Sequence, residues 1–185
     1  MLRASAQNIP RTRSPEWTAW GLIHSGASFP RQGHIMGPIF EAVLRFFEDD
    51  RWNAAQLDGE PVLSMSVAGQ NGQWRCVAKS REEQQQFIFY SVCGTPAPED
   101  RRQAVAEFVA RANFGIVIGN FELDFNDGEI RYKTSIDLEG VAPAPALIKN
   151  LVYANVRMMD RYLPAITQVI EGHASPQAAI ASVES

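Results

Sequence analysis

The sequence predicts one α+β domain in the order α-β-β-β-α-β-β-α, with a mostly antiparallel sheet and its helices packed on one face. Two glycine-containing turns, each between runs of alternating apolar residues, predict two antiparallel hairpins. Apolar residues at helical spacing before, between and after the hairpins predict three helices. The 185 residues, 45% hydrophobic and 21% charged, are typical of a globular domain and exclude wholesale disorder.

Composition also limits the classes of function. The chain has no run of 18 apolar residues, so no membrane-spanning helix is predicted. A net charge of −4 does not suit a protein that coats nucleic acid or an anionic membrane. Two cysteines do not make a disulfide framework. We therefore expect a cytoplasmic protein with neither nucleic-acid nor membrane partners.

Residues 1–35 are expected to form a disordered N-terminal extension, because no apolar period runs through them for long. They hold four arginines and one acid, so residues 36–185 carry 13 Lys and Arg against 20 Asp and Glu, a net charge of −7. Three interpretations stay open for this segment. It is an organelle transit peptide, a native extension, or the product of a start codon assigned too early, with the true start at Met36.

The first helix is predicted to begin at Pro38 and to end near Asp50. Proline suits the first helical turn, and the apolar residues that follow fall on one helical face. Its last turn carries Glu48, Asp49 and Asp50, which is the wrong sign for the helix dipole there. This acidic end is interpreted either as solvated or as a patch for a basic partner.

Three strands are predicted to follow as an antiparallel meander. The first alternates apolar and serine residues around Met65, and the second alternates similarly over residues 74–78. Gln70-Asn71-Gly72 joins them, since Asn-Gly accepts positive φ at both central positions of a turn. A polar run, residues 80–86, leads to the third strand. Residues 87–92 are apolar on both faces, which is typical of a central strand.

The second helix is predicted to start at Thr95, whose side chain can cap it, with prolines and acids in the first turn. It should end at Gly115 in the left-handed conformation. The second hairpin then runs through residues 119–136 and turns at Asn126-Asp127-Gly128. The expected buried stripe of this helix consists of Ala104, Val105, Phe108, Val109 and Ala112.

A long last helix is predicted after Pro145, and Gly172 should stop it. Pro164 must kink or break it, because its ring displaces a backbone hydrogen bond to the previous turn. Residues 173–185 are small and polar and are expected to fray. The broad apolar face of this helix consists of Leu147, Leu151, Val152, Met158, Met159, Tyr162, Leu163 and Ile166.

The residues favour no catalytic, metal or cofactor site. All three histidines, His24, His34 and His173, lie outside residues 36–172, so imidazole catalysis, a Ser-His-Asp set and a histidine zinc site are unsupported. Cys76 and Cys93 have no CxxC spacing and are expected to be small buried apolar residues. Residues 115–119 do not continue as a phosphate-binding loop, so their glycines are expected to stop a helix and begin a strand.

Carboxylates on the second hairpin are the remaining candidates for chemistry. Glu122 and Asp124 share a predicted strand face, about 7 Å apart by strand rise. That separation suits a glycosidase pair, but the spacing of the hairpin acids does not match a calcium-binding EF-hand. Arg131 and Lys133 lie on the partner strand, so cross-strand ion pairing is the simpler interpretation.

The body of the chain resembles the YbjN-domain family over about residues 38–172. The matching segments are Val105-Ala-Glu-Phe-Val, Arg111-Ala-Asn113, Gly119-Asn-Phe-Glu-Leu-Asp124, Asp127-Gly-Glu-Ile-Arg-Tyr132, Tyr162-Leu-Pro-Ala-Ile166 and Ile170-Glu-Gly172. We therefore assign residues 36–172 to a YbjN-like domain, similar to cyanobacterial or plastid members. The resemblance implies a fold like that of type III secretion chaperones, a role in regulating sensory transduction, and no catalytic residues.

These observations predict a non-enzymatic, chaperone-like protein-binding module with a protein or peptide partner. Members of this fold often act as dimers, so a homodimer is one expectation. Two surfaces are candidates: a sheet edge for strand addition, and a hydrophobic groove beside the terminal helix that Met65, Met158 and Met159 would suit. The alternative is a small-molecule binder or minor enzyme that uses Glu122 and Asp124.

Overall fold

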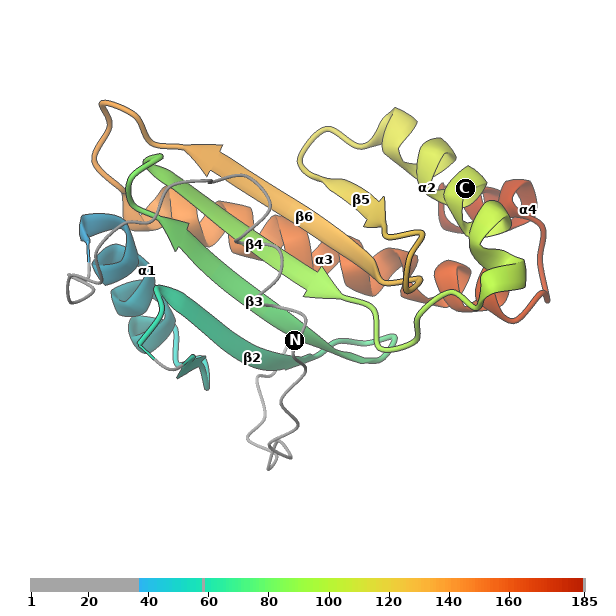
Figure 1. Cartoon of the computed structure of the whole chain (residues 1–185), viewed down its shortest axis with the longest axis horizontal. Coiled ribbons are helices and arrows are strands. Elements are labelled where there is room, and N and C mark those ends of the chain that lie inside the picture. The colour runs from blue at the N-terminus through green and yellow to red at the C-terminus, as the bar shows by residue number, and fades with distance from the viewer. Residues whose placement is uncertain (1–36, 58, 185) are drawn as a thin grey trace.

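The computed structural model describes residues 37–57 and 59–184, and within them a six-stranded sheet and four α-helices (Figure 1). The expected N-terminal extension, residues 1–35, lies outside the described residues. The elements are α1 (Pro38–Asp49), β1 (Ala55–Gln56), β2 (Val62–Ala68), β3 (Gln73–Arg81), β4 (Gln86–Val92), the 3-10 turn η2 (Glu99–Arg101), α2 (Arg102–Gly115), β5 (Asn120–Leu123), β6 (Ile130–Asp137), α3 (Pro145–Ile170) and α4 (Pro176–Glu184).

The sheet has the strand order β1-β2-β3-β4-β6-β5, and all neighbouring strands are antiparallel. The predicted meander (β2, β3, β4) and the second hairpin (β5, β6) are therefore confirmed. Sequence analysis did not predict β1 or the pairing of β4 with β6, which joins meander and hairpin into one sheet. In register, Cys76 faces Ser91 on β4, and Ser91 faces Tyr132 on β6.

The long helix α3 crosses one face of the sheet and packs on β4 and β6, and α1 packs beside it (Figure 1). The helices α2 and α4 pair with each other at one end of the sheet, where they also contact α3. This arrangement confirms the α+β class and the expectation that helices cover one face. It also places the α2–β5 connection beside the middle of α3, where the interaction surface described below is found (Figure 1).

The core between α3 and the sheet is rich in aromatic side chains. Trp74 is buried and donates a hydrogen bond from Nε1 to Ser91 Oγ at 2.9 Å, and Cys76 Sγ lies 3.3 Å from the same oxygen. Burial raises the pKa of the Cys76 thiol to about 12 and also raises that of Cys93. Both cysteines are thus small buried residues, as predicted.

The expected fraying of residues 173–185 is wrong, because most of this segment forms α4. Ser175 Oγ accepts a hydrogen bond from the Ala178 backbone N–H at 3.2 Å, and Pro176 occupies the first turn. Ala179 is fully buried, so the helix is held by packing against α2 and α3. Serine followed by proline is a helix-start signal that the small, polar composition of the segment obscured.

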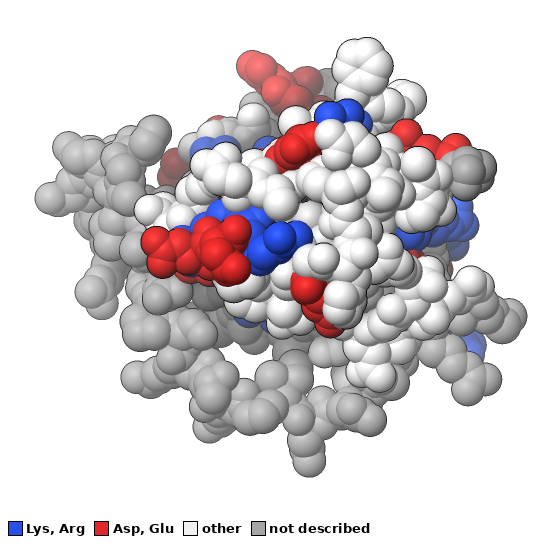
Figure 2. Space-filling view, turned by 90° about the vertical axis from the view of Figure 1, so that its right-hand side faces the viewer, with Lys and Arg blue, Asp and Glu red and all other residues white. Residues whose placement is uncertain are grey.

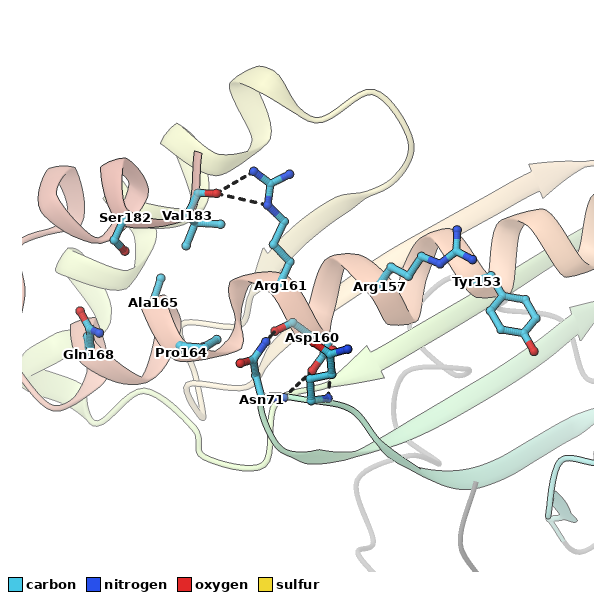
Figure 3. A pocket seen from close by; sticks show the side chains of 11 residues that line it. Asn71, Tyr153, Arg157, Asp160, Arg161, Pro164, Ala165, Gln168, Ser182 and Val183 are labelled. Carbon is cyan, nitrogen blue, oxygen red and sulfur yellow. Dashed lines mark hydrogen bonds between the residues drawn. The ribbon is translucent and has the colours of Figure 1, made fainter. Parts of the chain in front are cut away.

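Pro164 does not end α3, which continues to Ile170. Proline has no N–H, so the Asp160 carbonyl four residues earlier has no helical donor. Asn71 Nδ2 donates to that carbonyl at 2.9 Å. The Asp160 carboxylate in turn accepts the backbone N–H groups of Asn71 at 2.8 Å and Gln70 at 3.1 Å (Figure 3). The β2–β3 hairpin is therefore docked on α3 at its proline.

Several predicted turn and cap conformations differ from the structure. Asn71 does not adopt a positive φ; within this turn only Gly72 does. Thr95 does not cap the second helix, which starts with η2 after Pro98 and has no side-chain cap. Gly115 ends α2 without a positive φ, and Ile116 continues in extended conformation. The predictions for Asn71 and Gly115 assigned a backbone angle, and that for Thr95 a side-chain cap, from residue type alone.

The boundaries of β3 and β4 and the buried face of α3 also differ from the prediction. β3 runs to Arg81 and β4 starts at Gln86, so the connection within residues 80–86 is a short turn in which Gln85 has φ 51°. On α3, Leu147 is 39% exposed and Met158 only half-buried, although both were placed on the buried face. Ile148 and Asn155 are buried there instead.

Candidate protein-interaction surface

The acidic hairpin serves to hold two strands together. Glu122 on β5 accepts a hydrogen bond from Arg131 Nε at 2.7 Å and forms an ion pair with Lys133, both on β6. Burial by itself would raise the pKa of Glu122, but the bonds from Lys133 and Arg131 outweigh it and lower the pKa. The predicted cross-strand ion pairing is confirmed.

Asp124 lies beyond the end of β5 and makes a separate local contact. Its Oδ1 accepts the backbone N–H and the side-chain Nδ2 of Asn126, both at 2.8 Å, which fixes the turn of the hairpin. Neither Glu122 nor Asp124 lines the two grooves described below. The geometry therefore gives no support to a small-molecule or catalytic site on this hairpin.

The basic pair Arg101 and Arg102 makes structural contacts with backbone carbonyls. Arg101 donates from Nε and Nη2 to the Val169 carbonyl at 3.1 and 2.7 Å, where the C-terminal end of α3 favours a cation. Arg102 donates to the Phe125 carbonyl at 2.8 Å. Among the described residues no group of three or more His, Cys, Asp or Glu is placed to hold a metal ion. In the same part of the chain, no helix is both long and apolar enough to cross a membrane.

An apolar segment that runs from the last turn of α2 toward β5 is exposed to solvent. Phe114, Val117 and Ile118 expose 97%, 94% and 56% of their surface, and we call residues 114–118 the apolar loop. Figure 2 looks onto the end of the molecule that carries α2 and α4, where charged residues gather in small clusters separated by uncharged surface. Contiguous exposed apolar residues of this kind mark interaction sites in soluble proteins.

Polar contacts on both sides hold the apolar loop in place. Before it, Asn113 accepts the Phe121 backbone N–H at 2.8 Å and donates to the Phe121 carbonyl at 3.0 Å. Within it, the Ile118 carbonyl accepts a hydrogen bond from the Tyr132 hydroxyl. After it, Gly119 has φ 84° and lies so close to the Lys133 carbonyl that a Cβ would collide with it. The loop is therefore held with Phe114, Val117 and Ile118 exposed, while Ile116 packs against the core.

A groove of about 480 Å³ separates the apolar loop from α3, and we call it the apolar groove. The loop forms one wall, and α3 contributes the half-buried Met158 and the buried Tyr162. Glu184 of α4 closes one side, where it accepts a hydrogen bond from the Tyr162 hydroxyl at 2.8 Å. Burial raises the pKa of Tyr162 to about 12, with the Glu184 bond acting in the same direction, so this phenol stays a donor.

A second groove of about 940 Å³ lies on the other side of the same stretch of α3, and we call it the polar groove (Figure 3). Its walls come from the β2–β3 turn, α3 and α4. Arg157 and Arg161 line both grooves, so the two adjoin along α3. Arg161 reaches α4, where its Nη2 donates to the Val183 carbonyl at 2.6 Å.

Of the three acids at the end of α1, Asp50 is bonded to α3, whereas Glu48 and Asp49 are exposed. Asp50 accepts hydrogen bonds from Tyr153 at 2.5 Å, Lys149 at 3.0 Å and Trp52 at 3.2 Å. Burial by itself would raise the pKa of Asp50, but the three hydrogen bonds outweigh it and lower the pKa. Asp50 therefore fits neither a solvated helix end nor a patch for a basic partner.

The structure agrees only in part with the two binding surfaces that the sequence predicted. The groove beside the terminal helix exists, but of the three methionines proposed for it only Met158 lines it, whereas Met65 and Met159 are buried in the core. A sheet edge also exists, since β1 pairs with Leu63 and Ser64 of β2 and not with the rest of that strand. Sequence analysis missed the apolar loop. Its signal is three consecutive β-branched apolar residues between two glycines, outside any alternating pattern.

Comparison with known proteins gives a family for the chain. The family model of YbjN, described as "Putative bacterial sensory transduction regulator", matches residues 40–168. No curated protein matches the chain. One solved structure, "Crystal Structure of the ExsC-ExsE Complex", contains a chain similar to this one, with 10% identity and a TM-score of 0.47. The similarity covers 70% of this chain and 94% of that one. The resemblance seen in the sequence is thus confirmed, and the chain belongs to the YbjN family.

Proposed function

We propose that the protein is a non-enzymatic, chaperone-like regulatory module that binds a peptide segment of a partner protein in the apolar groove. The observation that carries this proposal is the apolar loop, in which Phe114 and Val117 are almost fully exposed. Covering apolar surface is favourable by roughly 25 cal/mol per Å². Polar contacts hold the loop in a conformation that exposes these side chains. A partner that covers them would therefore gain binding free energy.

The family description and the chemistry of the chain support a binding role. YbjN proteins are described as regulators of sensory transduction, which is a role that needs partners more than catalysis. We also propose that the protein acts in the cytoplasm, and its free thiols, Cys76 and Cys93, suit a reducing compartment. The second candidate surface is the open edge of β2, which an extended peptide could join as a strand.

The proposal is tested with random linear peptides displayed on phage and selected on the intact chain. The most enriched sequence is then synthesised and titrated against variants. Val117→Asp should weaken its binding at least about tenfold, because the hydrated carboxylate replaces the apolar surface that a bound peptide would cover. Val141→Asp is the matched control, since Val141 is also exposed and lies in the β6–α3 connection, at the opposite end of the sheet from α2 (Figure 1).

Thermal melting of both variants shows whether they remain folded. The proposal is overturned if no peptide is enriched, or if the selected peptide binds the Val117→Asp variant as well as it binds the wild type. Equal loss of affinity in both variants would also contradict it, because the effect would then come from added negative charge rather than from the groove. Light scattering on the same samples determines whether the chain is a homodimer.

A further inference from the structure

We infer that the bound peptide carries an acidic side chain, Asp or Glu, next to its apolar residues, and that Arg157 binds this carboxylate. The inference rests on the proposed function and specifies the chemistry of its partner. It comes from the position and contacts of one arginine. Arg157 lies at the boundary between the apolar groove and the polar groove, on the exposed side of α3.

Within the described ranges, 37–57 and 59–184, Arg157 has no carboxylate within ion-pair distance. Its guanidinium lies instead over the Tyr153 ring, whose centroid is 5.7 Å from the guanidinium carbon. Figure 3 shows the side chain lying along α3 between Arg161 and Tyr153, with no hydrogen bond to the residues drawn. A guanidinium presents a planar fork of donors that matches a carboxylate, so Arg157 is well suited to receive one from a ligand.

The acidic residues near Arg157 are already occupied by other groups. Asp50 accepts hydrogen bonds from Lys149, Tyr153 and Trp52. Asp160 is turned toward the β2–β3 hairpin, where it binds two backbone N–H groups. Glu184 holds the Tyr162 hydroxyl. Arg157 is therefore a cation that these intramolecular contacts leave available, in a body whose net charge is negative.

The position of Arg157 between two adjoining grooves favours a side-chain carboxylate over a terminal one. A peptide that passes from the apolar groove to the polar groove crosses Arg157 and Arg161, which line both. Its chain does not need to end there, so an internal Asp or Glu is the fitting partner. Its aliphatic residues would contact Val117 and Met158, and its polar continuation would meet the Gln70 and Gln168 side of the polar groove.

The test uses the synthetic peptide that was selected on phage. Each acidic residue of the peptide is replaced in turn by its amide, and Arg157→Gln is made in the protein. We expect one amide replacement to weaken binding to the wild type about tenfold and Arg157→Gln to weaken binding of the parent peptide similarly. The two changes together should weaken binding little more than either alone, since both remove the same interaction. Arg45→Gln, at an exposed position of α1, is the matched control.

The outcomes separate this inference from the proposed function. If the selected peptides need Val117 but contain no excess of acidic residues, or if Arg157→Gln leaves their affinity unchanged, the inference is wrong and the proposed function stands. If the peptides bind independently of Val117, the proposed function itself is wrong. If the chain is a dimer that Val117→Asp converts to a monomer, a second copy occupies the groove and the acidic-peptide inference is overturned.

Discussion

At the scale of single residues, a few backbone positions determine whether the hairpin and loops of this chain can form. Gly128 has φ 81°, and its carbonyl accepts the Ala97 backbone N–H at 2.8 Å. A Cβ at Gly128 would run into the Ala97 carbonyl, which is backbone and cannot swing away. Gly140 has a similar φ of 70° but no atom within 4 Å of the place where its Cβ would lie.

Alanine substitutions at the two glycines separate the cost of backbone strain from the cost of a collision between the new Cβ and a neighbouring atom. Gly140→Ala should lower the free energy of unfolding by about 1 kcal/mol, the cost of a left-handed alanine. Gly128→Ala carries the same strain plus the collision with Ala97, so the loss of stability should exceed that of Gly140→Ala by at least about 1 kcal/mol. Urea denaturation of both variants measures the difference. Equal losses of stability would show that the collision with Ala97 adds nothing.

At the scale of elements, the caps of helices come from residues distant in the sequence. The N-cap residue of α1, Gly37, has no side chain to accept a hydrogen bond. Glu82, in the turn between β3 and β4, accepts the backbone N–H groups of Phe40 at 2.7 Å and Ile39 at 3.3 Å instead. Its negative charge also suits the N-terminal end of the helix dipole. One carboxylate thus fastens α1 to the sheet.

This cap gives the second stability prediction. Glu82→Ala should lower the free energy of unfolding by about 1 kcal/mol, the usual value of a side-chain N-cap. Glu83→Ala removes the same charge from the next, exposed position and should change it by less than about 0.5 kcal/mol. Thermal unfolding followed by circular dichroism compares the pair. A decrease of equal size in both variants would mean that net charge, and not the cap, is responsible.

Comparison of prediction and structure shows which elements depend on local information. The amphipathic period of α1 and the alternation in β2 and β3 are local patterns, and both were predicted correctly. Other features depend on tertiary contacts: the Glu82 cap, the use of the Asp160 carbonyl left free by Pro164, and the docking of α4. The residues in each of these contacts lie tens of positions apart in the chain. Hydrophobic periodicity and turn motifs in a single sequence do not reveal contacts at that separation.

The candidate surface was predictable to a similar degree. A groove beside the terminal helix was expected, and Met158 lies in it. The loop that forms its other wall was identified only as a helix stop followed by a strand start. Apolar residues such as Val117 and Ile118 are ordinarily expected to be buried, so their exposure became visible only with the position of α2 and β5.

At the scale of the whole molecule, the described residues pack around one core, and the apolar loop is the part of it that exposes large apolar side chains next to a groove. All four helices and the sheet contribute to one apolar core, with α2 and α4 at one end of the sheet and the apolar loop beside the middle of α3 (Figure 1). The acidic hairpin and the Asp50 cluster are used internally to join strands and helices. What remains available to a partner is an apolar loop beside an arginine, and this is the central claim about function.

Hydrogen exchange of the intact chain, with and without the selected synthetic peptide, tests that claim most directly. Backbone amides shielded by a bound peptide exchange more slowly, and mass spectrometry locates them along the chain. We predict slower exchange over residues 113–119 and no change over residues 65–68, the open edge of β2. Protection confined to residues 65–68 would contradict the account, because the peptide would then have joined the sheet as a strand and left the apolar groove empty.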